Sequence, residues 1–380
     1  MQRATRGALC AAVLLASLMM TACGIGGPTK GEVYVYVAAP LSGWQADGGQ
    51  TVVGGARLAA EELNKSGGLL GYRVEIVPVD DEADSDVALS VAEQIRADVE
   101  AGKRVLGVIG HYNSGQCAAA LPVYAGLPII VITPTASDPS LTDQGYTRFF
   151  RVNATDAAQG PFDAEFLVND LGKTRIVVVF AENAYGRGLR DPMVAALEGL
   201  GAAPLAVIGI EEGAPSHAGI IPQIAAANPD AVFMAGYETE GYVLLPELRE
   251  AGIEATFMAS DGCFLYDFVD GAGKWAEGAY VSGITPDPKV VADKDWWSSY
   301  QEVEGRNPGP NSVGGYSAMR VLAEGVKAAK TLAADDVSAA IRGNRVETLI
   351  GSVQYDAKGD LQAQRIYIFR VEDGEFAQVK

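Results

Sequence analysis

The sequence is poor in the side chains that most enzymes and metal sites use. Only two histidines, His111 and His217, and four cysteines occur in 380 residues. No His-x-x-x-His or Cys-x-x-Cys spacing is present, which argues against a metal site. Ser114 and Cys117 follow His111, but no Gly-x-Ser-x-Gly turn surrounds the serine. We therefore predict no enzyme, no metal and no cofactor; a nucleophile paired with His111 is the enzymatic alternative.

Basic residues are also scarce. The chain has 29 Lys and Arg against 48 Asp and Glu, for a net charge of −19 at pH 7. Nucleic-acid binding needs clusters of basic side chains at the phosphates, so nucleic acid is excluded as a partner. The acidic run at residues 80–82 is predicted to lie in a solvated loop, with a calcium site as the alternative.

Long apolar runs are missing after the N-terminus, and the one near it is short. Two arginines precede the apolar residues 8–20, a run too short to span a bilayer, and small residues then lead to Cys23. This order predicts a signal peptide over residues 1–22. Its ending resembles bacterial lipoprotein signals, which implies that Cys23 carries lipid and that residues 23–31 form a tether. An ordinary signal peptide with a chance cysteine is the alternative.

From Glu32 onward, short apolar runs alternate with helical apolar spacing. Residues 33–39 read as a strand, and residues 52–63 and 87–99 read as helices. Such alternation predicts an α/β fold with parallel strands and helices on both faces. The pattern restarts after Phe149, and a single sheet of ten or more parallel strands would be unusual. We therefore predict two Rossmann-like lobes, each with its own parallel sheet.

Two apolar runs, residues 104–110 and 127–133, end at loops that carry small hydroxyl side chains. Uninterrupted apolar runs are typical of strands buried on both faces of a sheet. Ligands of open parallel sheets bind beyond the carboxyl ends of the strands. Ser114, Thr135 and Ser137 are therefore predicted to contact a small polar ligand. Capping of a helix or turn is the alternative role of the two serines.

Three predicted strands in the second half end at aromatic or acidic side chains. Tyr185 follows the strand that ends at residue 180, and Tyr237 follows the strand that ends near residue 233. Asp261 follows the next strand. Because the carboxyl ends of parallel strands meet at one edge, these side chains form a second group of predicted ligand contacts.

Several motifs along the chain resemble those of the extracytoplasmic leucine/isoleucine/valine-binding proteins of ABC importers, which belong to the type I periplasmic binding protein group. The motifs are Ala-Pro-Leu-Ser-Gly at 39–43, Gly-Gly at 67–68, Val-Asp-Asp at 79–81, Gly-His-Tyr-Asn-Ser at 110–114, Ile-Thr-Pro-Thr-Ala-Ser at 132–137, Asn-Ala-Tyr-Gly at 183–186, Gly-Tyr at 236–237 and Asp-Gly at 261–262. The resemblance covers nearly the whole mature chain. It implies two lobes joined by three crossings, with residues 32–153 plus 287–360 in one lobe and residues 154–286 plus 361–380 in the other.

The resemblance also implies roles for the predicted contacts. In the first lobe, the carboxylate and ammonium groups of an amino acid would be held by Ser114, Thr135, Ala136 and Ser137, with Thr135 acting largely through its backbone. In the second lobe, Tyr185 and Tyr237 would close over the ligand, and Asp261 would face its ammonium group. A buried ammonium group needs such an anionic partner.

Two departures from the family concern aromatic residues and cysteines. Relatives specific for aliphatic amino acids often carry an aromatic residue at the position matched by Gly48. Trp44 is the nearest aromatic here, and it either lines the side-chain pocket or simply packs.

Some relatives also have a disulfide at positions that here are Ala83 and Asn113. The mature chain has only Cys117 and Cys263, which the resemblance places in opposite lobes near the cleft. A bond between them would tie the lobes together. We therefore predict free thiols.

Taken as a whole, the resemblance implies a lipid-anchored solute receptor at the outer face of the cytoplasmic membrane or in the periplasm. The receptor would be a monomer. It would bind an amino acid with a branched-chain or other aliphatic side chain and deliver this amino acid to an ABC permease. One alternative is a receptor for an amide, urea or an aromatic acid, because fold does not fix the ligand. Another is a sensory receptor with the same fold.

Overall fold

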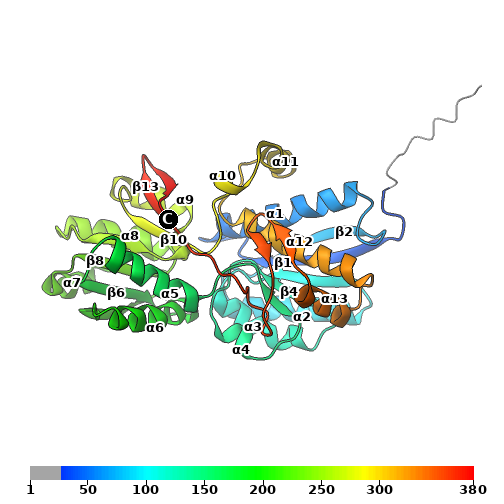
Figure 1. Cartoon of the computed structure of the whole chain (residues 1–380), viewed down its shortest axis with the longest axis horizontal. Helices are drawn as coiled ribbons and strands as arrows, with labels where there is room; N and C mark the ends of the chain where they lie inside the picture. The colour runs from blue at the N-terminus through cyan, green and yellow to red at the C-terminus, as the bar shows by residue number, and fades with distance from the viewer. Residues whose placement is uncertain (1–26) are drawn as a thin grey trace, which may run out of the picture.

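Two lobes of α/β structure lie side by side in the computed structural model (Figure 1). The structure describes residues 27–380, so the predicted signal peptide and the predicted lipid-attachment residue Cys23 lie outside the described residues. The first lobe is built on a five-stranded sheet and the second on a seven-stranded sheet. The predicted fold class, two lobes with parallel sheets flanked by helices, is confirmed.

The first sheet is parallel throughout and has the strand order β2-β1-β3-β4-β5. Its strands are β1 (Glu32–Ala39), β2 (Arg73–Asp80), β3 (Val105–Gly110), β4 (Ile130–Thr133) and β5 (Phe149–Arg151). Every residue of β3 and β4 is buried, as the uninterrupted apolar runs predict. These two strands therefore lie in the middle of the lobe and aim the loops that follow them at the other lobe.

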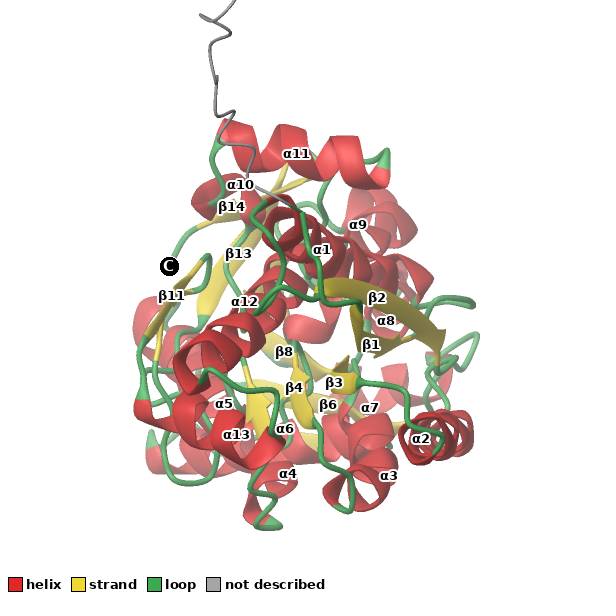
Figure 2. Cartoon of the chain, turned by 90° about the vertical axis from the view of Figure 1, so that its right-hand side faces the viewer, coloured by secondary structure: helices red, strands yellow, loops and turns green. Residues whose placement is uncertain are grey.

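Helices cover both faces of the first sheet (Figure 2). On one face lie α1 (Ala46–Lys65), α12 (Ser312–Ala329) and α13 (Ala334–Gly343), and on the other lie α2 (Ser85–Glu100) and α3 (Ser114–Ala125). The short helix α4 (Ser140–Asp143) follows β4. A hairpin of β11 (Val346–Thr348) and β12 (Gly351–Val353) adds Val346 and Val353 to the hydrophobic core on the side of α1, α12 and α13.

Glycines allow α1 and α12 to contact at backbone distance. A Cβ atom on Gly55 would overlap the carbonyl oxygen of Ser312, and one on Gly315 would overlap the carbonyl oxygen of Val52. This close contact holds a helix from the last fifth of the chain against the first helix. Helix α11 (Lys294–Glu304) packs nearby, because its Trp296 and Tyr300 cluster with Leu58 of α1.

The second sheet has the order β14-β13-β10-β9-β8-β6-β7. Its strands are β6 (Ile176–Ala181), β7 (Ala206–Ile210), β8 (Ala231–Ala235), β9 (Thr256–Ala259), β10 (Tyr280–Gly283), β13 (Tyr367–Glu372) and β14 (Glu375–Gln378). The strands from β10 to β7 in this order pair in parallel, as predicted, and two antiparallel strands extend the sheet: β13 pairs with β10, and β14 pairs with β13. A tight hairpin at Asp373 and Gly374, both with positive φ, joins β13 to β14 and makes this pair antiparallel.

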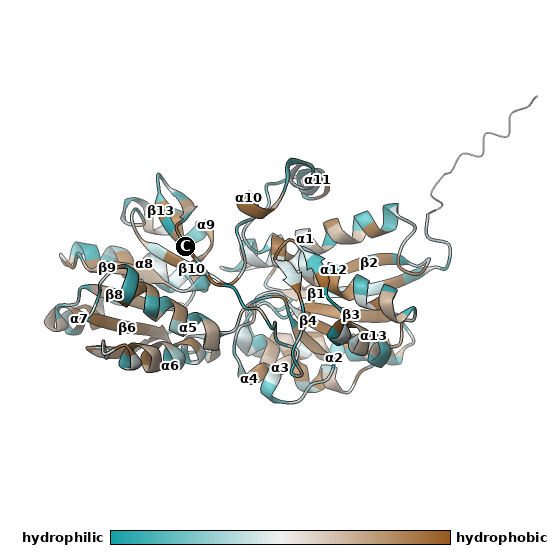
Figure 3. Cartoon of the chain, viewed as in Figure 1, coloured by the Kyte–Doolittle hydropathy of each residue, from teal (hydrophilic) through white to brown (hydrophobic). Residues whose placement is uncertain are grey.

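Helices cover both faces of the second sheet as well. On one face lie α5 (Asp156–Glu165), which continues as a π-helical turn (Phe166–Asp170), and α6 (Ala184–Gly199). On the other lie α7 (Ile221–Ala227), α8 (Glu238–Glu250) and α9 (Tyr266–Ala272). Hydropathy colouring shows apolar strands such as β6 between helices of mixed polarity (Figure 3). Among the described residues, no helix has both the length and the apolarity required to cross a membrane.

The chain passes between the lobes three times, as predicted. The crossings run from β5 to α5, from β10 to the short helix α10 (Pro288–Val291), and from β12 to β13. The second crossing contains Ile284 and Thr285, which lie at the cleft between the lobes. The carboxyl ends of the central strands of both sheets face this cleft.

Candidate functional site

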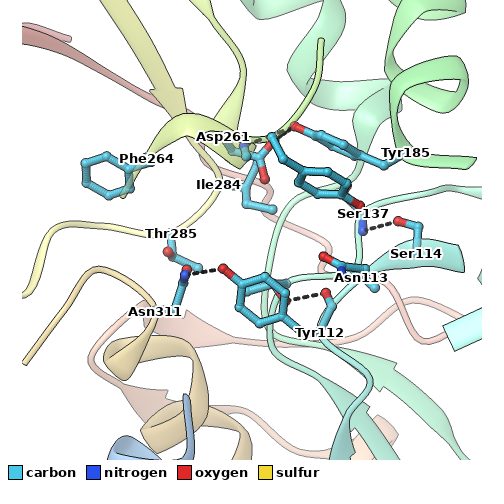
Figure 4. Close-up of a pocket in the computed structure, with 14 residues that line it drawn as sticks. Tyr112, Asn113, Ser114, Ser137, Tyr185, Asp261, Phe264, Ile284, Thr285 and Asn311 are labelled. Atoms are coloured by element: carbon cyan, nitrogen blue, oxygen red, sulfur yellow. Dashed lines mark hydrogen bonds between the residues drawn. The ribbon is translucent and has the colours of Figure 1, made fainter. Parts of the chain in front are cut away.

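A cavity lies between the lobes, beyond the carboxyl ends of β3 and β4 on one side and of β6, β8 and β9 on the other (Figure 4). It holds about 450 Å³ of empty space, counted with the part that is open to solvent. Of the residues predicted from the sequence, the lining includes Ser114, Thr135, Ala136, Ser137, Tyr185, Tyr237 and Asp261.

The Ser114 hydroxyl ties together the two loops of the first lobe. Its oxygen accepts hydrogen bonds from the backbone N–H groups of Ser137, at 3.3 Å, and Asp138, at 3.2 Å. Ser114 is the first residue of α3, and the N-cap position belongs to Asn113. Ser114 therefore does not cap the helix, which was the alternative role predicted for it. Because the oxygen accepts both bonds, the hydroxyl proton is available to an acceptor in the cavity.

Thr135 uses its hydroxyl inside the fold. The hydroxyl donates to the carbonyl of Tyr112 at 2.5 Å. The neighbouring Thr133 donates to the carbonyl of His111 at 2.9 Å and accepts from the N–H of Ala136 at 2.9 Å. The loop after β4 is therefore held rigidly against the loop after β3, and the lining atoms of both loops are fixed in position.

The second lobe contributes two tyrosines and an acid. The rings of Tyr185 and Tyr237 stack with their centroids 5.1 Å apart. The hydroxyl of Tyr185 lies 2.8 Å from the hydroxyl of Ser260, hydrogen-bonds the carboxylate of Asp261 and accepts from the N–H of Gly262 at 3.2 Å. This network fixes the direction in which the carboxylate points.

Asp261 is the one carboxylate in the lining, and the structure gives it no cationic partner among the described residues. Burial raises its pKa to about 6, against the hydrogen bond from Tyr185, which lowers it. Burial also raises the pKa of Tyr185 well above its ordinary value, so this phenol stays protonated and able to donate. The second-lobe wall is therefore suited to a cation, and the first-lobe wall supplies hydrogen-bond donors.

Trp44 is not part of the lining. Its ring lies 5.6 Å from the ring of Tyr237, across the gap between the lobes, and the residue is 38% exposed. The space beside Gly48 is taken by Tyr112, whose hydroxyl oxygen would lie 2.5 Å from a Cβ atom on that glycine. Tyr112 therefore occupies the place where an aromatic residue at position 48 would lie.

The lining also contains residues that sequence reasoning missed: Tyr112, Asn113, Gly262, Phe264, Ile284, Thr285 and Asn311. Tyr112, Asn113 and Gly262 fall inside motifs that carried the family resemblance, so their position beside predicted contacts was the available signal. Thr285 and Asn311 come from the second crossing and from the residue before α12. Only the fold brings these two segments to the cavity.

His111 and Asp81 form a buried pair outside the cavity. Nδ1 of His111 lies 2.7 Å from the Asp81 carboxylate, Nε2 lies 3.0 Å from the Tyr124 hydroxyl, and both His111 and Asp81 have no exposed surface. The predicted solvated loop at residues 80–82 is therefore wrong for Asp81, because its carboxylate is needed to satisfy the buried imidazole. Both imidazole nitrogens are engaged, so neither activates Ser114.

The two cysteines of the described chain are buried and free, as predicted. Cys117 belongs to the core of the first lobe and Cys263 to that of the second. Burial raises the pKa of Cys117 to about 12, which keeps the thiol protonated and unreactive. Within residues 27–380, no cluster of three His, Cys, Asp or Glu side chains is arranged to hold a metal ion.

Known proteins share this sequence pattern and this fold. A family model described as "Periplasmic binding protein" matches residues 32–375. An "Amino acid binding protein" of Pseudomonas aeruginosa is 28% identical over 96% of this chain and 97% of its own length. "Leu/Ile/Val-binding protein homolog 1" of Brucella melitensis is 29% identical over 92% of this chain and 93% of its own. The crystal structure of a leucine binding protein, LivK, from Thermotoga maritima matches with a TM-score of 0.85 at 25% identity, covering 92% of this chain and 98% of that one.

Proposed function

Because this chain belongs to the periplasmic binding protein family, we propose that it is a receptor of an ABC importer that binds a free amino acid between its lobes. It delivers the amino acid to a permease in the cytoplasmic membrane. It acts outside that membrane as a monomer, attached through lipid on Cys23. Relatives named for amino acids, and for leucine, isoleucine and valine, support this proposal.

The observation that carries the proposal is the pairing of opposite walls in one cavity. Asp261 and Tyr185 from the second lobe face the Ser114 and Ser137 loops of the first. An amino acid carries an ammonium group for the carboxylate and a carboxylate for the hydroxyl and N–H donors. Each charge-assisted hydrogen bond is worth about 1.5–3 kcal/mol.

Aliphatic amino acids are the first candidates, because of the relatives' names and because Phe264 and Ile284 contribute apolar surface to the lining. Receptors for amides, urea or aromatic acids are the competing class. An aromatic acid has no ammonium group and would leave Asp261 without a partner inside a closed cleft, at a cost of several kcal/mol. The site therefore favours a ligand that carries both charges.

The test is calorimetry of the purified protein with each amino acid and with urea, small amides and benzoate. We expect at least one amino acid to bind, and Asp261→Asn to weaken its binding by about 2–5 kcal/mol, since the substitution removes one partner of a buried charge pair. Asp270→Asn is the matched control, because Asp270 is an exposed acid on α9 outside the cavity. Unchanged affinity in Asp261→Asn would remove that residue from the site, and binding of benzoate alone would overturn the proposal.

A further inference from the structure

The side of the cavity that lies away from Asp261 and Tyr185 is polar (Figure 4). We name this side the distal wall and define it by Tyr112, Asn113, Thr285 and Asn311. All four residues are nearly buried, with exposed fractions of 7%, 5%, 3% and 9%. All four residues line the cavity, and their unpaired polar ends are in contact with the solvent inside it.

The hydrogen bonds of the distal wall leave four polar ends unused. Asn311 donates through Nδ2 to the hydroxyl oxygen of Tyr112 at 2.6 Å, and Asn113 donates through Nδ2 to Oε1 of Gln45 at 2.7 Å. The other end of each amide, the hydroxyl proton of Tyr112 and the hydroxyl of Thr285 form no hydrogen bond with any described residue. Each amide is thus anchored at one end and free at the other.

No charged side chain belongs to the distal wall, since Asp261 is the one ionisable carboxylate of the lining and no Lys or Arg lines it. Burial raises the pKa of Tyr112 well above its ordinary value, so this phenol remains a neutral donor. A side-chain carboxylate placed here would lose its water without gaining a cation, and the one carboxylate of the lining, Asp261, is already assigned to the α-ammonium group. The wall offers donors and acceptors for a neutral polar group.

We propose that the receptor selects amino acids whose side chain is uncharged and carries a hydroxyl or amide group, in preference to aliphatic amino acids of the same shape. This inference rests on the amino-acid binding proposed above, but it places polar uncharged side chains ahead of the aliphatic ones named there as first candidates. An aliphatic side chain would displace water from the four free polar ends and return no hydrogen bonds. Sites built to pair with a polar ligand group reject the analogue that lacks it, because their own groups are then left unpaired.

The test is calorimetry with pairs of amino acids that match in shape: threonine against valine, and asparagine against leucine. The protein is unfolded and refolded first, to remove any ligand carried from the cell. We expect the polar member of at least one pair to bind roughly ten-fold or more tightly than its partner. Equal or tighter binding of valine and leucine would overturn the inference and leave the proposed function standing. Binding of no amino acid would overturn both.

Two conservative variants assign the preference to the distal wall. Thr285→Val removes one hydroxyl and keeps the shape, and Tyr112→Phe removes another; each should lower the polar-to-aliphatic affinity ratio several-fold. Thr256→Val is the matched control, because Thr256 is the partly buried first residue of β9, at the end of the strand away from the cavity. A ratio that stays the same in both distal-wall variants would contradict the inference even if the wild-type protein prefers threonine.

Discussion

Asp261 is the side chain whose surroundings a bound ligand would change most. Two further buried acids, Asp156 and Asp163, have their pKa raised by burial first, and the charge of Asp261 raises both further. Both oxygens of the Asp156 carboxylate and one oxygen of the Asp163 carboxylate have no hydrogen-bond partner among the described residues. An ammonium group beside Asp261 would favour the ionised form of that carboxylate, which burial alone disfavours.

This arrangement predicts a pH dependence of binding. The pKa of Asp261 is about 6 in the cavity, above the ordinary value of a carboxyl group, and an ammonium group binds the ionised form. Affinity should therefore be constant above pH 7 and fall as the pH drops through about 6, by at most ten-fold per pH unit. The linked effect on stability has the opposite sign. The ligand-free protein gains stability as the pH falls from about 6 towards 3.8, the ordinary pKa of an aspartate, because protonation removes a buried charge.

Calorimetry between pH 5 and 8 measures the dependence, and Asp261→Asn should abolish it. A profile that stays flat in the wild-type protein, or that survives in Asp261→Asn, would show that another group controls binding.

At the scale of helices and strands, the contact between α1 and α12 is the most sensitive packing in the first lobe. Gly315→Ala places a methyl group into the backbone carbonyl of Val52, so the helices must separate. We expect the free energy of unfolding to fall by about 1–3 kcal/mol, as for overpacking elsewhere.

Urea denaturation measures the loss, with Gly343→Ala as the control. Gly343 is the last residue of α13, and a Cβ atom there would contact nothing. A Gly315→Ala protein as stable as wild type would mean that α1 and α12 tolerate a wider separation.

The elements show why the sequence predicted some features and missed others. Uninterrupted apolar runs predicted β3 and β4 because burial on both faces leaves a local pattern. The antiparallel pairing of β13 has no such pattern, because direction in a sheet depends on which strand lies next to it. Likewise, Asp81 reads as a loop acid in sequence, and only the buried imidazole of His111 beside it explains its burial.

The same limit applies to the site. Ser114, Tyr185 and Asp261 follow strand ends, where ligands of parallel sheets bind, so the sequence predicted them as candidates. Thr285 and Asn311 lie in a crossing and before a late helix, and they reach the cavity only through the packing of the lobes. For this reason, the residues proposed to hold the ammonium and carboxylate groups of the ligand were easier to predict than the residues proposed to distinguish one amino acid from another.

At the scale of the whole molecule, the ligand would lie between two lobes that also meet beside the cavity. Trp44 of the first lobe meets Tyr237 of the second at 5.6 Å between ring centroids, and the lining is shared between the lobes. Because contacts from both lobes are made together only in the closed form, ligand binding shifts the population towards closure.

Small-angle X-ray scattering should therefore show a smaller radius of gyration when a tightly bound amino acid is added. Asp261→Asn at the same ligand concentration is the control and should stay near the ligand-free value. An identical radius in the two states of the wild-type protein would mean that the lobes are already closed without ligand.

The packing of α12 against α1 has a consequence for how the protein is made. The contact of α1 with α12 forms only when residues up to 329 are available, and the second sheet gains β13 and β14 only from the last 14 residues. Neither lobe can reach its final form while the chain is still emerging from the ribosome. A chain whose lobes are completed only by its last elements remains incompletely folded until synthesis is nearly finished, which suits passage through a secretion channel to the proposed location.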